Sequence, residues 1–141
     1  MATAYVWNGY ALNQSAIPIS RDGTPEPQAG DAVTRWHGED TYDLLRDPVE
    51  QKRLLQVITE EQFDRLSWLL SFRPPAAVEG DYLHIDGCVK YLCDAQNAAI
   101  AVRISDGAPF VRMFDDGDVT LGMPKGEEMP PLLQAHAVRY P

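Results

Sequence analysis

The sequence contains only two cysteines, Cys88 and Cys93, and no apolar run near the roughly 20 residues needed to cross a bilayer. Five residues apart on an extended strand, their Cα atoms would lie roughly 16 Å apart. They could form a disulfide only if the chain bends between them. We therefore expect two buried thiols in a reducing compartment. The N-terminus also lacks the basic and apolar segments of a secretory signal, and we expect a cytoplasmic protein.

Motifs of common enzyme classes are absent as well. The chain has no Gly-x-Gly-x-x-Gly, no Gly-Lys-Ser/Thr loop and no Gly-x-Ser-x-Gly, which removes the usual nucleotide-binding and esterase classes. It has three histidines: His37, His84 and His136. His84 and Asp86 would share one side of a strand, a spacing compatible with a metal pair, but Asp86 fits the first position of a tight turn better. We expect no metal ion, no cofactor and no catalytic residue.

The net charge of −9 is the clearest feature of the composition. Residues 79–128 carry more of the negative charge than either flanking part. Such acidity opposes binding to nucleic acid and to anionic membranes, because phosphates repel it. It permits a basic protein partner or mimicry of nucleic acid, but solubility alone is the explanation that we favour. The length of 141 residues supports one hydrophobic core, so we expect a single domain over 1–141.

Turn and capping signals divide the chain into four parts. Residues 1–37 are expected to form short strands, at 5–7 and 31–36, around a loop at 20–30 that is rich in proline and glycine. Residues 40–72 are predicted to form three helices. Their start signals are Asp40 or Thr41, then Asp47-Pro48, then the capping box of Thr59-Glu60-Glu61-Gln62.

Residues 81–121 predict an antiparallel meander. Asp-Gly pairs at 86–87, 106–107 and 116–117 are typical of tight turns between its strands, which places a strand at 88–92. Prolines on both sides limit the tail, 129–141, to an irregular segment with one helical turn at most. The predicted fold is α+β. It is a mostly antiparallel sheet of about five to eight strands, with two or three helices inserted between its N- and C-terminal parts and packed on one face.

The third helix carries an aromatic pair outside its apolar stripe. Phe63, Leu66, Leu69 and Leu70 form the stripe, whereas Trp68 and Phe72 fall on the opposite side. Glu61 and Arg65 lie on that side too and can pair with each other. Tryptophan beside arginine is enriched at binding hot spots. The alternative is a helix buried on two sides, with both aromatic residues in the core.

These features favour a binding protein over an enzyme. We predict a small acidic intracellular inhibitor, of the immunity-protein or phage-inhibitor type, that occludes the surface of an enzyme or toxin without catalysis. The predicted partner-binding residues are Glu61, Arg65, Trp68, Phe72, Asp115, Asp116 and Asp118. Two alternatives stay open: a small enzyme that uses His37 or His84 with nearby carboxylates, and a structural subunit that associates with itself.

Overall fold

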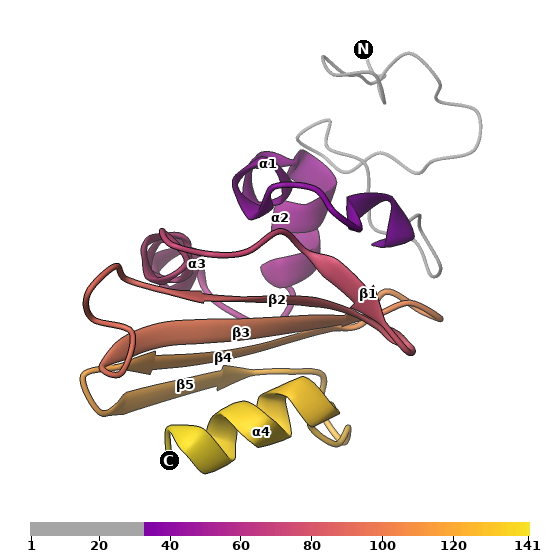
Figure 1. Cartoon of the computed structure of the whole chain (residues 1–141). Coiled ribbons are helices and arrows are strands. Elements are labelled where there is room, and N and C mark those ends of the chain that lie inside the picture. Colours follow the sequence, from indigo (N-terminus) through magenta and orange to yellow (C-terminus); the bar gives the residue numbers. More distant parts are fainter. Residues whose placement is uncertain (1–32) are drawn as a thin grey trace.

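A computed structural model describes residues 33–141, and within them the predicted α+β fold is confirmed (Figure 1). The described part contains four α-helices and one five-stranded antiparallel sheet. The predicted strand at 5–7 and the loop at 20–30 lie outside the described residues. No helix among residues 33–141 is long and apolar enough to span a membrane.

The three helices predicted in the first half form where their caps place them. They are α1 (Thr41–Arg46), α2 (Pro48–Leu54) and α3 (Glu60–Leu69). Asp40 caps α1 by accepting from the Tyr42 amide, and Asp47 caps α2, where a proline takes the first helical position. Thr59 and Gln62 form the predicted capping box of α3.

The strand predicted at 31–36 is wrong over its described part. Val33–Trp36 forms a short 3-10 helix, η2. Within the described residues it pairs with no strand. Val33 is buried in the core, and the Trp36 indole donates to the Glu50 carboxylate at 3.1 Å. Packing against the helices therefore overrides the local β propensity of this segment.

The strands follow one another in the sheet in chain order, with antiparallel neighbours throughout. They are β1 (Ala77–Glu79), β2 (Tyr82–Cys88), β3 (Gln96–Arg103), β4 (Pro109–Asp115) and β5 (Asp118–Gly122). The predicted turns at 106–107 and 116–117 are confirmed. In the second, Asp116 and Gly117 both have positive φ, 52° and 93°, as a two-residue hairpin turn requires.

The turn predicted at Asp86–Gly87 is wrong. β2 runs straight through both residues and ends at Cys88, so of the strand predicted at 88–92 only Cys88 is in a strand, and residues 89–92 belong to the connection that follows. Gly87 serves close packing: a Cβ there would lie 2.8 Å from the Phe72 carbonyl oxygen and 2.8 Å from the Arg73 Cβ. Glycine at this position therefore allows the segment after α3 to approach β2. Close approach of another backbone is a common reason for glycine inside a strand.

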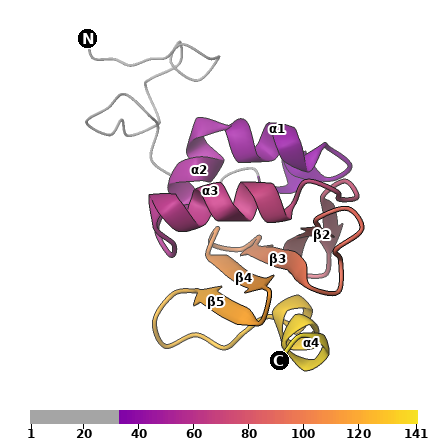
Figure 2. The same cartoon turned by 90° about the vertical axis from the view of Figure 1, so that its left-hand side faces the viewer.

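Helices cover both faces of the sheet (Figures 1 and 2). α1, α2 and α3 pack on one face over a core that includes Leu66, Leu69, Ile85 and Ile100. The opposite face is covered by α4 (Pro131–Arg139), whose Leu133 is buried with Ala99, Ala101 and Phe110. The irregular tail predicted at 129–141 is therefore wrong. Pro131 stands at the first position of α4, where a missing amide hydrogen costs nothing.

A buried ion pair joins the helical layer to the β3–β4 turn. Arg53 and Glu50 of α2 are both almost fully buried, and their side chains meet at 2.8 Å. Arg53 also donates to the Gly107 carbonyl at 3.0 Å. Because each charge has a partner, the desolvation of both groups is offset, and α2 is held in one position over the sheet.

Candidate functional site

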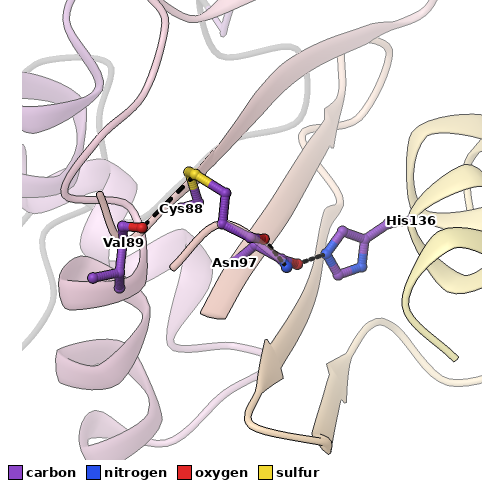
Figure 3. Close-up of a disulfide and its surroundings, with 5 residues drawn as sticks. Cys88, Val89, Asn97 and His136 are labelled. Atoms are coloured by element: carbon purple, nitrogen blue, oxygen red, sulfur yellow. Dashed lines mark hydrogen bonds between the residues drawn. A yellow bond between two sulfur atoms is a disulfide. The ribbon is translucent and has the colours of Figure 1, made fainter. Parts of the chain in front are cut away.

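A disulfide closes the connection between β2 and β3. Cys88 ends β2, the chain turns over 89–95, and Cys93 comes back to bond with Cys88, with 4.9 Å between the two Cα atoms (Figure 3). The prediction of two buried thiols is therefore wrong, because it rested on an extended strand between them. Both cysteines are half-buried. Residues 88–93 are called the disulfide loop below.

The tip of the disulfide loop presents an aromatic ring to solvent. The Tyr91 side chain is 90% exposed, and its backbone has φ of 69°, in the left-handed region that non-glycine residues rarely occupy. The Lys90 ammonium lies 5.3 Å from the centre of the Tyr91 ring, and Leu92 is exposed beside it. Tyrosine held out in this way is typical of a residue that anchors a protein contact.

Backbone hydrogen bonds within the connection order the chain around this tip. The Leu92 amide donates to the Val89 carbonyl at 2.8 Å, and the Ala95 and Gln96 amides both donate to the Leu92 carbonyl. The Val89 amide donates to the Gln96 carbonyl at 3.0 Å. Together with the disulfide, these bonds fix most of the backbone before any partner arrives, which reduces the entropy cost of binding.

The segment that follows α3 pairs with the start of the disulfide loop. Phe72 and Cys88 form an isolated β-bridge in which each amide donates to the carbonyl of the other residue at 2.9 Å. The Phe72 side chain is 57% exposed. One residue of the aromatic pair predicted from the sequence therefore lies directly beside the disulfide loop.

The other residue of the pair, Trp68, lies on α3 and is 43% exposed. The Arg65 guanidinium lies 4.3 Å from the centre of the Trp68 ring. Arg65 donates to the carboxylate of Asp115 on β4. Glu61 lines a shallow surface pocket together with Arg65 and Trp68, but the ion pair of Arg65 is with Asp115. The hydrogen bond from Arg65 lowers the pKa of Asp115 below its usual value. The Arg65–Glu61 pair expected within the helix is thus replaced by a pair between α3 and β4.

The acidic β4–β5 turn completes this part of the surface. The Asp116 amide donates to the Ala95 carbonyl at 2.8 Å, and the Gln96 side chain donates to the carboxylates of Asp115 and Asp116 at 3.0 and 3.3 Å. Asp118 follows as the first residue of β5. The disulfide loop, the end of α3 with Phe72, and the turn at 115–118 therefore meet at one end of the sheet, which faces the viewer in Figure 2. We call this region the loop end.

The last residue of the disulfide loop is also connected to α4. The Asn97 amide group donates to the Cys93 carbonyl at 2.8 Å, and its oxygen lies 2.5 Å from His136 Nε2 (Figure 3). His136 Nδ1 lies 2.9 Å from the Arg112 guanidinium. Burial and the neighbouring Arg112 charge lower the pKa of His136 to about 4, so its ring is neutral at physiological pH.

The lowered pKa of His136 makes the stability depend on pH in a defined range. Between about pH 6.5 and pH 4 the unfolded chain binds a proton at this histidine and the folded chain does not. The free energy of unfolding should therefore fall by on the order of 1–2 kcal/mol as the pH drops through this range, after allowance for solvent screening of the half-buried ring. Denaturant unfolding at several pH values measures it. The variant His136→Gln should show a shallower slope, and an unchanged slope would exclude His136 as the source.

The other two histidines both contact residues of β1. His37 Nδ1 accepts a hydrogen bond from the Val78 amide at 2.9 Å, and His84 Nδ1 lies 3.7 Å from a carboxylate oxygen of Glu79. Within residues 33–141, no three histidine, cysteine or acidic side chains gather as a metal site would require. The alternative of an enzyme built on His37 or His84 gains no support from these contacts.

The exposure of Trp68 and Phe72 agrees with the helical pattern in the sequence, whereas Lys90, Tyr91 and Leu92 were not among the predicted site residues. These three residues were predicted to lie in a strand, where an exposed tyrosine is unremarkable. The signal that was available is the short spacing of the two cysteines. That spacing is too long for a bridge along a strand and well suited to closing a small loop.

Comparison with known families identifies the class of protein. The family model of Ivy, described as inhibitor of vertebrate lysozyme, matches residues 50–137, from α2 through all five strands to α4. Comparisons with curated proteins and with solved structures found no match. Because the family model covers more than half of the chain, this protein belongs to the Ivy family of lysozyme inhibitors and is a protein-binding enzyme inhibitor.

Proposed function

We propose that this protein inhibits a vertebrate lysozyme by placing the disulfide loop against the substrate cleft of the enzyme. The single observation that carries the proposal is the tip of that loop, where Tyr91 is 90% exposed on a backbone closed by the Cys88–Cys93 bond. A narrow, ordered projection fits a concave site, because it buries a large part of its own surface without first losing conformational freedom.

The charge at the tip suits the chemistry of the target. Lysozyme cleaves glycosidic bonds with a glutamic acid and an ionised aspartate that flank the bond. Lys90 is the exposed cation beside Tyr91, and it can approach these carboxylates when the tip enters the cleft. The acidic turn at 115–118 and the net charge of −9 suit basic groups outside the cleft.

The disulfide also bears on where the inhibitor acts. Disulfides persist in oxidising compartments and are rare in a reducing cytoplasm. A contact loop that depends on the Cys88–Cys93 bond would keep its conformation outside the cytoplasm. The proposal therefore includes an oxidising compartment as the place of action, in place of the cytoplasmic location expected from the sequence.

The proposal is tested by titrating the full chain against a vertebrate lysozyme while the hydrolysis of peptidoglycan is measured. We expect stoichiometric loss of activity and a complex that elutes as one species in gel filtration. An unrelated glycosidase serves as control and should keep its activity. Full hydrolysis in the presence of a micromolar excess of the folded, disulfide-bonded chain would contradict the proposal.

The surface around Trp68 is proposed as a second contact at the rim of the interface. Trp68→Ala should weaken inhibition by about tenfold, which corresponds to about 1.4 kcal/mol. It should change the free energy of unfolding by about 1 kcal/mol or less, because the ring is already 43% exposed. Leu55→Ala, at an exposed apolar residue at the end of α2, is the matched control and should leave inhibition unchanged. A large loss of stability in Trp68→Ala would instead assign the ring to the core.

A further inference from the structure

The two bases of the disulfide loop are held by different means. At the first base, Cys88 pairs with Phe72 through two backbone hydrogen bonds. At the second base, the Cys93 carbonyl accepts from the side chain of Asn97, which in turn contacts His136 of α4. The conformation of the second base thus depends on side chains that the proposed contact with lysozyme does not use.

We infer that Asn97 and His136 are positioning residues that set the presentation of the disulfide loop from the opposite face of the sheet. They act through a chain of three hydrogen bonds, from Arg112 to His136, from His136 to Asn97, and from Asn97 to the Cys93 carbonyl. Its role in inhibition rests on the proposed function, whereas its effect on the loop conformation does not.

The direction of every hydrogen bond in this chain is determined. The Arg112 guanidinium can only donate, so His136 Nδ1 accepts at 2.9 Å and the ring hydrogen lies on Nε2. Nε2 then donates to the amide oxygen of Asn97, which leaves the amide nitrogen to donate to Cys93. One histidine tautomer and one amide orientation satisfy all three contacts, so the chain specifies a single arrangement.

Arg112, where this series of hydrogen bonds begins, is itself held by several contacts. Arg112 of β4 is buried, and its guanidinium also donates to the His136 and Tyr140 carbonyls at 3.3 and 2.9 Å. These carbonyls lie at the C-terminal end of α4, where a cation and a donor are favourable. The same arginine therefore fixes both the end of α4 and the histidine ring that contacts Asn97.

Packing alone does not provide this constraint, because a pocket lies on one side of the buried Asn97. A cavity of about 330 Å³ lies between α4 and the base of the disulfide loop, lined among others by Gly87, Cys88, Cys93, His136 and Tyr140. Side chains that surround an open cavity are not held by contacts across it. The hydrogen bonds through Asn97 bridge the two elements at this point, and they hold the second base where packing is incomplete.

The test interrupts this series of hydrogen bonds at two residues, in variants of the full protein. Asn97→Leu keeps the size of a buried side chain and removes both hydrogen bonds, while His136→Leu removes the donor to Asn97. Amide hydrogen exchange is measured at Leu92, Ala95 and Gln96, whose amides are bonded within the connection. We expect exchange there to be at least tenfold faster in both variants, with the central amides of β3 and β4 unchanged, and inhibition of lysozyme about tenfold weaker.

Three further measurements separate positioning from a general loss of stability. His136→Gln, which can keep a donor to Asn97, should recover part of the slow exchange and part of the inhibition. Val111→Ala, in the core on the other face, should lower the melting temperature without faster exchange in the connection. In the Asn97→Leu background, Tyr91→Ala should cause a smaller loss of inhibition than in the unmodified protein, because the ring is no longer held in place.

The outcomes distinguish the positioning role of Asn97 and His136 from the proposed function. Unchanged exchange at Leu92, Ala95 and Gln96 in both leucine variants would overturn the positioning role. Equally fast exchange in Val111→Ala would overturn it too, by attributing the effect to stability. If the unmodified protein fails to inhibit lysozyme but the exchange rates change as expected, the proposed function fails and the control of the loop by Asn97 and His136 stands. If Asn97→Leu does not fold, His136→Leu decides.

Discussion

Replacing Tyr91 by alanine is expected to weaken the inhibition of lysozyme by about 30-fold or more, which corresponds to about 2 kcal/mol of binding free energy. The ring is 90% exposed in the free protein and makes no contribution to the core, so the melting temperature should stay the same. The expected loss comes from the aromatic surface that the ring would bury in the cleft. Inhibition constants from the hydrolysis of peptidoglycan, with thermal unfolding beside them, measure both quantities.

The matched control for this prediction is Tyr91→Phe. It keeps the ring and removes the hydroxyl group, so it should retain most of the affinity if buried aromatic surface provides the binding energy. A loss as large as that of the alanine variant would assign the energy to a hydrogen bond from the hydroxyl group. Full inhibition by Tyr91→Ala would mean that the contact lies outside the tip, and it would contradict the proposed use of the disulfide loop.

The helices show which parts of the fold local signals determine. Asp40, Asp47 and Thr59 act on amides within three residues of themselves, so their caps could be predicted from the sequence. α4 could not, because its stability comes from residues distant in the chain. Leu133 is buried against β3 and β4, and Arg112 donates to the carbonyls at its end. The prolines before it suggested an irregular tail, yet one of them begins the helix.

The Asp-Gly pairs of the sheet show the same contrast between local signals and contacts with residues distant in the chain. The pairs at 106–107 and 116–117 form turns, but the pair at 86–87 lies inside β2. The dipeptide is equally able to turn in all three places. At 86–87 it stays extended, because both residues pair with β3 and the next residue, Cys88, also pairs with Phe72. A tertiary contact of this kind leaves no local signal. Because a turn was predicted at 86–87, the next strand was predicted at 88–92, among the residues that form the disulfide loop.

The candidate site was accessible to sequence reasoning in part. The helical period placed Trp68 and Phe72 outside the apolar stripe of α3, and the structure shows both at the surface, with Phe72 beside the disulfide loop. Their role in partner binding stays a prediction. The prediction of a protein-binding inhibitor is confirmed by membership of the Ivy family. The immunity-protein and phage-inhibitor targets had no residue-level basis, because a target is recognised by surface shape that composition does not encode.

Opening the disulfide is expected to have the other large effect. In the variant that carries Cys88→Ser together with Cys93→Ser, the chain between the two positions gains conformational freedom. Closing so short a loop contributes about 2 kcal/mol to the free energy of unfolding in the chain-entropy account, and the variant should lose about this amount. Inhibition should weaken by about 30- to 100-fold, because each tip residue must then be ordered on binding at a cost of about 1 kcal/mol.

Substitution is preferable to a reductant in this experiment, because lysozyme itself is a disulfide-bonded protein and a reductant would act on both partners. Asp94→Ala, at an exposed residue immediately after Cys93, is the matched control and should retain full inhibition. The phenotypes of the double serine variant and of Tyr91→Ala should differ: the first loses both stability and affinity, and the second loses affinity alone. If the double serine variant inhibits within threefold of the unmodified protein, the tip is ordered without the Cys88–Cys93 bond. The hydrogen bonds through Phe72 and Asn97 would then be sufficient to hold it.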